Sequence, residues 1–216
     1  MGTLQPCTQD VNISYMKKHK RTAYHHGSLQ KALIEYAFAH VRASGWDGFS
    51  MREAARELGV SPGAAYRHFK TLDDLLFEIA HLGFEKLDED MQKMREEAGD
   101  AHGALVGVGI AYLRFAKEEP HLFNLMFSDK IARLHEVCFE EEFSSSDCEP
   151  LVAALQTYIG ADCGADIRNQ CDFFWVVAHG IASLDATTGW RRSDAEKHAL
   201  LEKGIASLEA GRAQSE

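Results

Sequence analysis

The chain has 216 residues, of which 45% are hydrophobic, enough for one small domain and a second, larger core. It contains no run of 18 or more apolar residues, and its polar N-terminus lacks a hydrophobic signal region. We therefore expect a cytoplasmic protein without a membrane span. The formal net charge of −10 argues, by itself, against nucleic-acid binding.

The distribution of that charge reverses the argument. Residues 16–70 hold ten Lys/Arg against four Asp/Glu, a net of +6, whereas residues 71–216 hold thirteen against twenty-eight, a net of −15. A basic run, suited to a nucleic-acid backbone or a minor groove, precedes the first predicted helix and consists of Lys17, Lys18, Lys20 and Arg21. A solvated tail is the alternative interpretation of this run.

The stretch from Ser50 to Phe69 predicts a helix-turn-helix. Ser50 and Glu53 form a capping-box pattern, Gly59 ends the first short helix, and Ser61 followed by Pro62 starts the second. The two helices share an apolar face made of Ala54, Ala55, Leu58, Ala65 and Phe69. An earlier helix is predicted from about residue 28 to 43, with its own apolar stripe.

The outward residues of this segment are the candidate DNA contacts. The turn from Ser61 to Ala64 has small side chains, so its backbone can approach base edges in a major groove. The full candidate set is Arg21, Ser50, Arg52, Ser61, Gly63, Ala64, Tyr66, Arg67, His68 and Lys70.

Residues 24–75 resemble the N-terminal domain of the TetR family of bacterial transcription regulators, and V-S-P-G-A-A-Y-R-H-F resembles its recognition helix. The resemblance implies that Tyr66 and His68 contact phosphates and that residues 61–64 lie closest to the bases. It also implies that Arg52 approaches the DNA from the preceding helix. The family usually has Lys where this chain has Leu72, so that phosphate contact is either missing or moved to Lys70.

We therefore expect an all-α protein with three parts. Residues 1–23 form a basic flexible arm, 24–71 the DNA-binding domain, and 72–216 an effector-binding and dimerisation domain. The helices expected after the DNA-binding domain span 72–98, which connects the two domains, and 102–118, 121–127, 129–142, 151–160, 165–187 and 194–210.

Aromatic and Met side chains flank the break at Pro120, an arrangement that can open around an apolar ligand. A plain core is the alternative. The candidate effector site consists of Tyr112, Phe115, Phe123, Met126, Phe127, Phe174, Trp175 and His179. Because Arg114 and Lys117 fall off the Tyr112/Phe115 stripe, we expect an apolar or aromatic effector with one polar handle.

The helix over 165–187 is apolar on two sides, so both must be covered. One side, which includes Trp175 and His179, would face the core. The other is predicted to meet a second copy of the chain and consists of Phe173, Val177, Gly180 and Leu184. Together with the Pro120 segment, the W-x-x-x-H-G spacing resembles a TetR branch with a Trp/His-Gly signature.

His179 has two interpretations: a ligand-orienting group, or a core histidine satisfied by a neighbour such as Asp172 or Asp185. No cofactor or metal site is expected, because His135, Cys138 and Cys148 lack a fourth ligand at a recognisable interval. An enzyme is disfavoured, because Cys171 and His179 are about 12 Å apart along one helix.

The sequence thus predicts a homodimeric, ligand-responsive repressor that binds palindromic double-stranded DNA. The alternative is a redox-responsive regulator that senses oxidation through Cys138 and Cys148. Acidic neighbours of these cysteines would raise the thiol pKa, which works against that alternative.

Overall fold

The computed structural model describes residues 27–138, 148–159, 166–187 and 190–212, and within these ranges every regular element is a helix. The all-α expectation is therefore confirmed. The basic arm with Arg21, and also Cys7 and Cys163, lie outside the described residues.

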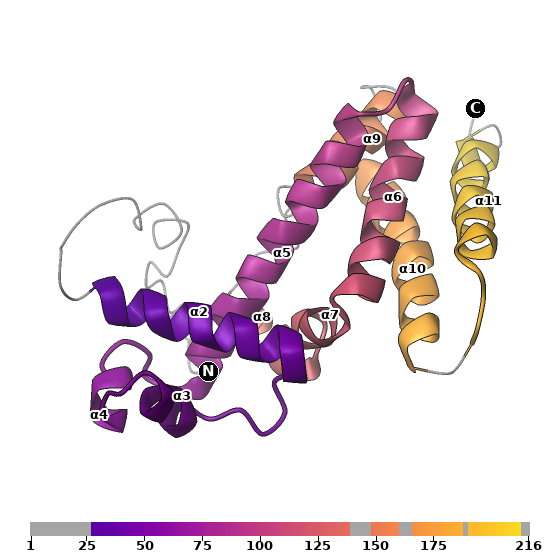
Figure 1. The fold of residues 1–216 in the computed structure, drawn as a ribbon. Coiled ribbons are helices and arrows are strands. Elements are labelled where there is room, and N and C mark those ends of the chain that lie inside the picture. The colour runs from indigo at the N-terminus through magenta and orange to yellow at the C-terminus, as the bar shows by residue number, and fades with distance from the viewer. Residues whose placement is uncertain (1–26, 139–147, 160–165, 188–189, 213–216) are drawn as a thin grey trace, which may run out of the picture.

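Three helices form the N-terminal domain: α2 (Gly27–Ser44), α3 (Met51–Glu57) and the single turn α4 (Pro62–Ala65). Glycines with positive φ follow α2 and α3, at Gly45 (84°) and Gly59 (67°). Residues with a Cβ rarely adopt this conformation, so these glycines mark the ends of both helices, and Gly59 does so as the sequence predicts. The α2 helix lies across the start of α5 (Figure 1).

The connector α5 (Leu72–Glu96) runs from the N-terminal domain into the C-terminal bundle (Figure 1). Its 25 residues make it about 38 Å long. The predicted capping box is present: Thr71 Oγ1 accepts from the Asp74 amide (3.0 Å), and the Asp74 carboxylate accepts from the Thr71 amide (2.9 Å).

The C-terminal bundle consists of α6 (Ala101–Glu118), α7 (Pro120–Met126), α8 (Asp129–Cys138), α9 (Glu149–Ile159), α10 (Asp166–Thr187) and α11 (Asp194–Arg212). Each begins and ends within about two residues of its expected bounds, except α8, whose predicted end falls outside the described residues. In Figure 1, α6 and α10 lie between α5 and α11.

Glycines allow several helices of the bundle to pack closely. A Cβ on Gly107 would lie 3.0 Å from the Met94 carbonyl oxygen of α5, and one on Gly109 would lie 2.4 Å from the Leu201 side chain of α11. Leu201 is fully buried, so α6 and α11 can approach only because residue 109 lacks a side chain. A continuous hydrophobic core runs from Leu33 in α2 to Leu208 in α11.

Candidate nucleic-acid interface and effector site

The helix-turn-helix is held by its caps and by a small buried face. Ser50 Oγ accepts from the Glu53 amide at 3.1 Å, and Ser61 Oγ accepts from the Ala64 amide at 3.3 Å. Below them, four side chains are at most 5% exposed: Ala54, Ala55, Ala65 and Phe69. The apolar anchors predicted from the sequence are therefore buried, apart from Leu58, which is half-buried.

Most candidate DNA contacts lie on the surface of this unit. Three are half-buried, Ser50, Ala64 and His68, and six are exposed, Arg52, Ser61, Gly63, Tyr66, Arg67 and Lys70. The Tyr66 ring is 43% exposed, although aromatic rings are usually covered. A Cβ on Gly63 would meet nothing within 4 Å, so the start of α4 is bare.

Leu72 and Lys70 differ in their surroundings. Leu72 is half-buried against the hydrophobic core, which leaves an apolar residue where the family usually has Lys. Lys70 is exposed in the turn that precedes α5. The chain therefore has a cation within two residues of the usual position.

Five of the predicted effector residues form one aromatic cluster, which we define as Tyr112, Phe123, Phe127, Trp175 and His179. Ring centroids are 5.0 Å apart for Tyr112 and Trp175, 4.7 Å for Phe123 and Phe127, and 4.8 Å for Phe127 and His179. Trp175 and His179, one helical turn apart on α10, are stacked with planes 9° apart. Because the rings contact one another directly, a ligand can enter only by displacing some of them.

A polar node lies inside this cluster. The Tyr112 hydroxyl is 2.7 Å from His179 Nδ1, and the Ser183 hydroxyl is 3.3 Å from His179 Nε2. Burial lowers the pKa of the His179 imidazole and raises the pKa of Tyr112, so both groups are neutral at neutral pH. His179 is thus satisfied by neighbouring side chains, but through two hydroxyls and not through Asp172 or Asp185.

The other three predicted effector residues are buried outside the cluster. Phe115, Met126 and Phe174 are 2–3% exposed. Among the described side chains, no ring contact joins Phe115 or Phe174 to the cluster. Met126 points toward α5, where its sulfur would lie 2.6 Å from a Cβ on Gly83. These three side chains therefore belong to the surrounding core.

The candidate pairing surface is a stripe along α10. Phe173 is 41% exposed and Leu184 44%, and a side chain on Gly180 would meet nothing within 4 Å. Val177 differs from the prediction, because it packs against Gly204 of α11 in the same chain. Val176, which the prediction omitted, is 68% exposed and completes the stripe.

The short helix α7 and its N-cap also contact the N-terminal domain. Glu119, just before α7, accepts a hydrogen bond from Arg42 Nε at 2.7 Å and another from Arg42 Nη2. Trp46 Nε1 donates to the Asn124 side-chain oxygen at 3.1 Å. We call Arg42, Trp46, Glu119 and Asn124 the interdomain clamp.

The burial of the described cysteines indicates unreactive thiols. Cys148 and Cys171 are buried, and burial raises the pKa of Cys171 to about 11. The side chain of Cys138 lies outside the described set, so the proposed Cys138/Cys148 sensor stays a prediction.

Within the described ranges, no three His, Cys, Asp or Glu side chains are grouped to hold a metal ion. None of the described helices is long and apolar enough to cross a membrane.

Comparisons with known proteins agree with this architecture. The model for bacterial regulatory proteins of the tetR family matches residues 33–79, and the model for the tetracyclin repressor-like C-terminal domain matches residues 105–208. The chain belongs to the TetR family. Because that family consists of regulators, membership argues against the enzyme alternative.

Individual relatives are distant. An uncharacterized HTH-type transcriptional regulator of Haemophilus influenzae is 29% identical over 102 residues, which are 46% of this chain and 49% of that protein. The chain thus spans about half the length of this curated relative.

Two solved structures share the fold. A protein of unknown function from Rhodococcus sp. RHA1 has a TM-score of 0.60 and 26% identity, over 88% of this chain and 98% of that one. A tetR-family transcriptional regulator from Streptomyces coelicolor has a TM-score of 0.65 and 18% identity, over 85% of this chain and 84% of that one.

The clamp yields a stability prediction. Replacing Arg42 with Ala leaves the Glu119 carboxylate, whose side chain is 10% exposed, without its cation. We expect the free energy of unfolding, measured with urea, to fall by about 1–3 kcal/mol. Lys31→Ala on the same helix breaks only an exposed pair with Glu35 and should cost less than about 0.5 kcal/mol. Equal losses in the two variants would contradict the assigned role of the clamp.

Proposed function

We propose that the chain is a ligand-responsive, DNA-binding transcriptional regulator, and specifically a repressor released from a palindromic operator by a small apolar or aromatic effector. The observation that carries the proposal is the bare start of α4 in a family of regulators. Gly63 has open space above it, and the exposed groups Tyr66 and Arg67 follow.

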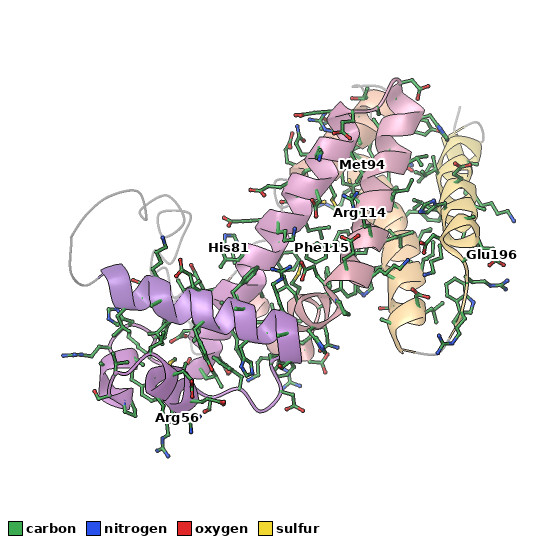
Figure 2. The ribbon with its side chains drawn as sticks, in the orientation of Figure 1. Arg56, His81, Met94, Arg114, Phe115 and Glu196 are labelled. Carbon is green, nitrogen blue, oxygen red and sulfur yellow. The ribbon has the colours of Figure 1, made fainter. Side chains whose placement is uncertain are left out.

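DNA binding follows from the shape and charge of this surface. The N-terminus of α4 has small side chains, which suit a close approach of its backbone to base edges. Arg52 projects from the preceding helix α3, and Lys70 lies just before α5. In Figure 2, Arg56 on α3 marks the outer edge of this domain, on the side away from the bundle. The cations around the start of α4 are therefore suited to pair with the phosphates that flank a DNA groove.

A dimer would supply the palindromic symmetry. The α10 stripe of Phe173, Val176, Gly180 and Leu184 leaves large apolar side chains uncovered in the single chain. Leu200 on the neighbouring α11 is also 38% exposed. Pairing of this face with its copy about a twofold axis would bury these groups. Two recognition helices about 34 Å apart would then read inverted half-sites.

The aromatic cluster is the proposed effector site. It offers five rings and one polar node, so an aromatic ligand with a single hydrogen-bonding group matches its chemistry. The neutral imidazole of His179 can donate one hydrogen bond and accept one, but offers no positive charge. A strongly anionic effector therefore fits this site poorly.

The α7 helix connects the two proposed activities. Phe123 and Phe127 contact the rings of the cluster, while Glu119 and Asn124 hold Arg42 and Trp46 of the DNA-binding domain. We propose that a ligand that displaces Phe123 or Phe127 shifts this short helix and, with it, the clamp. Such a ligand releases DNA only if it binds the displaced arrangement more tightly.

Our first functional prediction separates phosphate contacts from base contacts. Tyr66→Ala and His68→Ala should weaken binding to operator and random duplex alike, because phosphates carry no direct sequence information. Gly63→Leu should reduce operator binding selectively, because a bulky side chain would keep α4 out of the groove. Fluorescence anisotropy with both duplexes measures these effects, and circular dichroism checks the fold. An operator-only loss in the Tyr66 variant would contradict its phosphate role.

The second prediction concerns assembly. Gly180→Arg should keep the fold, because the position is open in the single chain, but should convert the dimer to monomer. The cause is a charge placed in an apolar contact, and sedimentation at micromolar concentration measures the result. Gly99→Arg, in the equally open turn before α6, is the matched control and should stay dimeric. A monomeric wild type would show that the chosen surface does not pair.

The third prediction concerns the effector. A lipophilic aromatic compound should quench Trp175 fluorescence and release operator DNA. Trp175→Ala should weaken effector binding at least about tenfold, because ring contacts are lost. Operator affinity measured without the effector should be unchanged. Trp190→Phe, outside the cluster, serves as the control. A screen in which only metal ions, sugars or nucleotides release DNA would overturn the proposed site.

A further inference from the structure

A second cavity lies outside the aromatic cluster. A groove of about 470 Å³ runs between the end of α6, the end of α10 and the start of α11, and none of the five cluster residues lines it. Its volume is in the range of small-molecule sites. Three apolar side chains of its lining are at most 8% exposed: Leu113, Ala116 and Ala182. The apolar part of the groove lining is therefore largely buried between these helices, with only a small area exposed to the groove.

Two ion pairs border this groove and differ in burial. Lys197, whose side chain is 9% exposed, pairs with Asp185 and joins α11 to α10. Lys117 Nζ lies 2.8 Å from Asp194 Oδ2 and joins α6 to α11, with both side chains 58% exposed. The buried pair is costly to separate, whereas the exposed pair separates at little cost. The exposed pair is therefore the part of the groove that can exchange its partners for a ligand.

Asp194 is held at a fixed position at the groove. Ser193 and Glu196 form a complete capping box: Ser193 Oγ accepts from the Glu196 amide (3.3 Å), and the Glu196 carboxylate accepts from the Ser193 amide (2.9 Å). Figure 2 labels Glu196 at the start of α11. Hydrogen bonds from Ser193 lower the pKa of Glu196 to about 2, so the cap persists through the neutral range.

The charges at the groove select the ligand class. The hydrogen bond between Lys117 and Asp194 raises the pKa of the lysine and lowers the pKa of the aspartate, so both are charged at neutral pH. A ligand with one charge pairs with only one of them: an anion on Lys117 leaves Asp194 with only the longer contact to Lys197 at 3.7 Å, and a cation on Asp194 leaves Lys117 without its hydrogen-bonded carboxylate. A ligand with adjacent positive and negative groups replaces one ion pair with two.

We propose that this groove binds a zwitterionic amino acid with an apolar side chain. The α-carboxylate pairs with Lys117, the α-ammonium pairs with Asp194, and the side chain lies on Leu113, Ala116 and Ala182. This site shares no residue with the proposed DNA and effector sites, and it adjoins the pairing stripe of α10 at Leu184. The bound ligand joins α6 to α11.

Three six-carbon probes of different charge test the proposal. L-norleucine carries both charges, hexanoate only the carboxylate, and hexylamine only the ammonium. Isothermal titration of the full-length chain, at one ionic strength and neutral pH, should show binding of norleucine at least about tenfold tighter than of either other probe. Equal or tighter binding of hexanoate or hexylamine, or absence of binding at millimolar norleucine, would overturn the proposal.

Variants locate the binding. Lys117→Gln and Asp194→Asn should each weaken norleucine binding at least about tenfold, because each variant removes one charged hydrogen-bond partner. The charge swap Lys117→Asp with Asp194→Lys should restore binding, because the zwitterion can reverse. Lys93→Gln, which neutralises an exposed lysine paired with Glu97 outside the groove, should change nothing. Trp175→Ala should keep norleucine affinity, and a loss there would place the binding in the aromatic cluster instead.

Discussion

The packing of α7 between the two domains is the constraint on which the rest of the structure depends. This seven-residue helix starts at Pro120, and Glu119 is both the C-cap of α6 and the N-cap of α7. Phe123 contacts the aromatic cluster, and the next residue, Asn124, accepts a hydrogen bond from Trp46 of the DNA-binding domain. The two contacts therefore share one short stretch of backbone, so a backbone shift at either residue displaces the other.

The sequence predicts the parts of this fold whose causes are local. The ends of α3, α4 and α5 follow from caps three residues apart, such as Thr71 with Asp74, and from a glycine that can adopt positive φ. Helix bounds were therefore right within about two residues. The helix-turn-helix is a local pattern of the same kind, which explains why its buried face could be named in advance.

Contacts between distant segments could not be found in this way. Arg42 and Glu119 are 77 positions apart, and Tyr112 reaches His179 over 67 positions. Ser183, one turn beyond His179, is the one ring-nitrogen partner that the local spacing of α10 indicates. The stripe on α10 was also misjudged by one residue, because successive side chains differ by 100° and Val176 and Val177 lie on either side of the true boundary. Only the position of α11 decides which of them is covered.

The closed aromatic cluster sets an energetic requirement on any effector. Rings that contact one another must separate before a ligand enters, so the effector has to offset the lost ring contacts and the Tyr112–His179 hydrogen bond. If the open arrangement is about 1% of the free protein, reversing that ratio requires the ligand to favour it by about 10⁴-fold, or about 5.5 kcal/mol. An aromatic ligand that restores ring contacts and supplies a new partner for His179 meets both demands at once. In the proposed effector site, a purely aliphatic ligand that displaces Tyr112 would leave Nδ1 of His179 unpaired, and that penalty would disfavour it relative to an aromatic ligand with a hydrogen-bonding group.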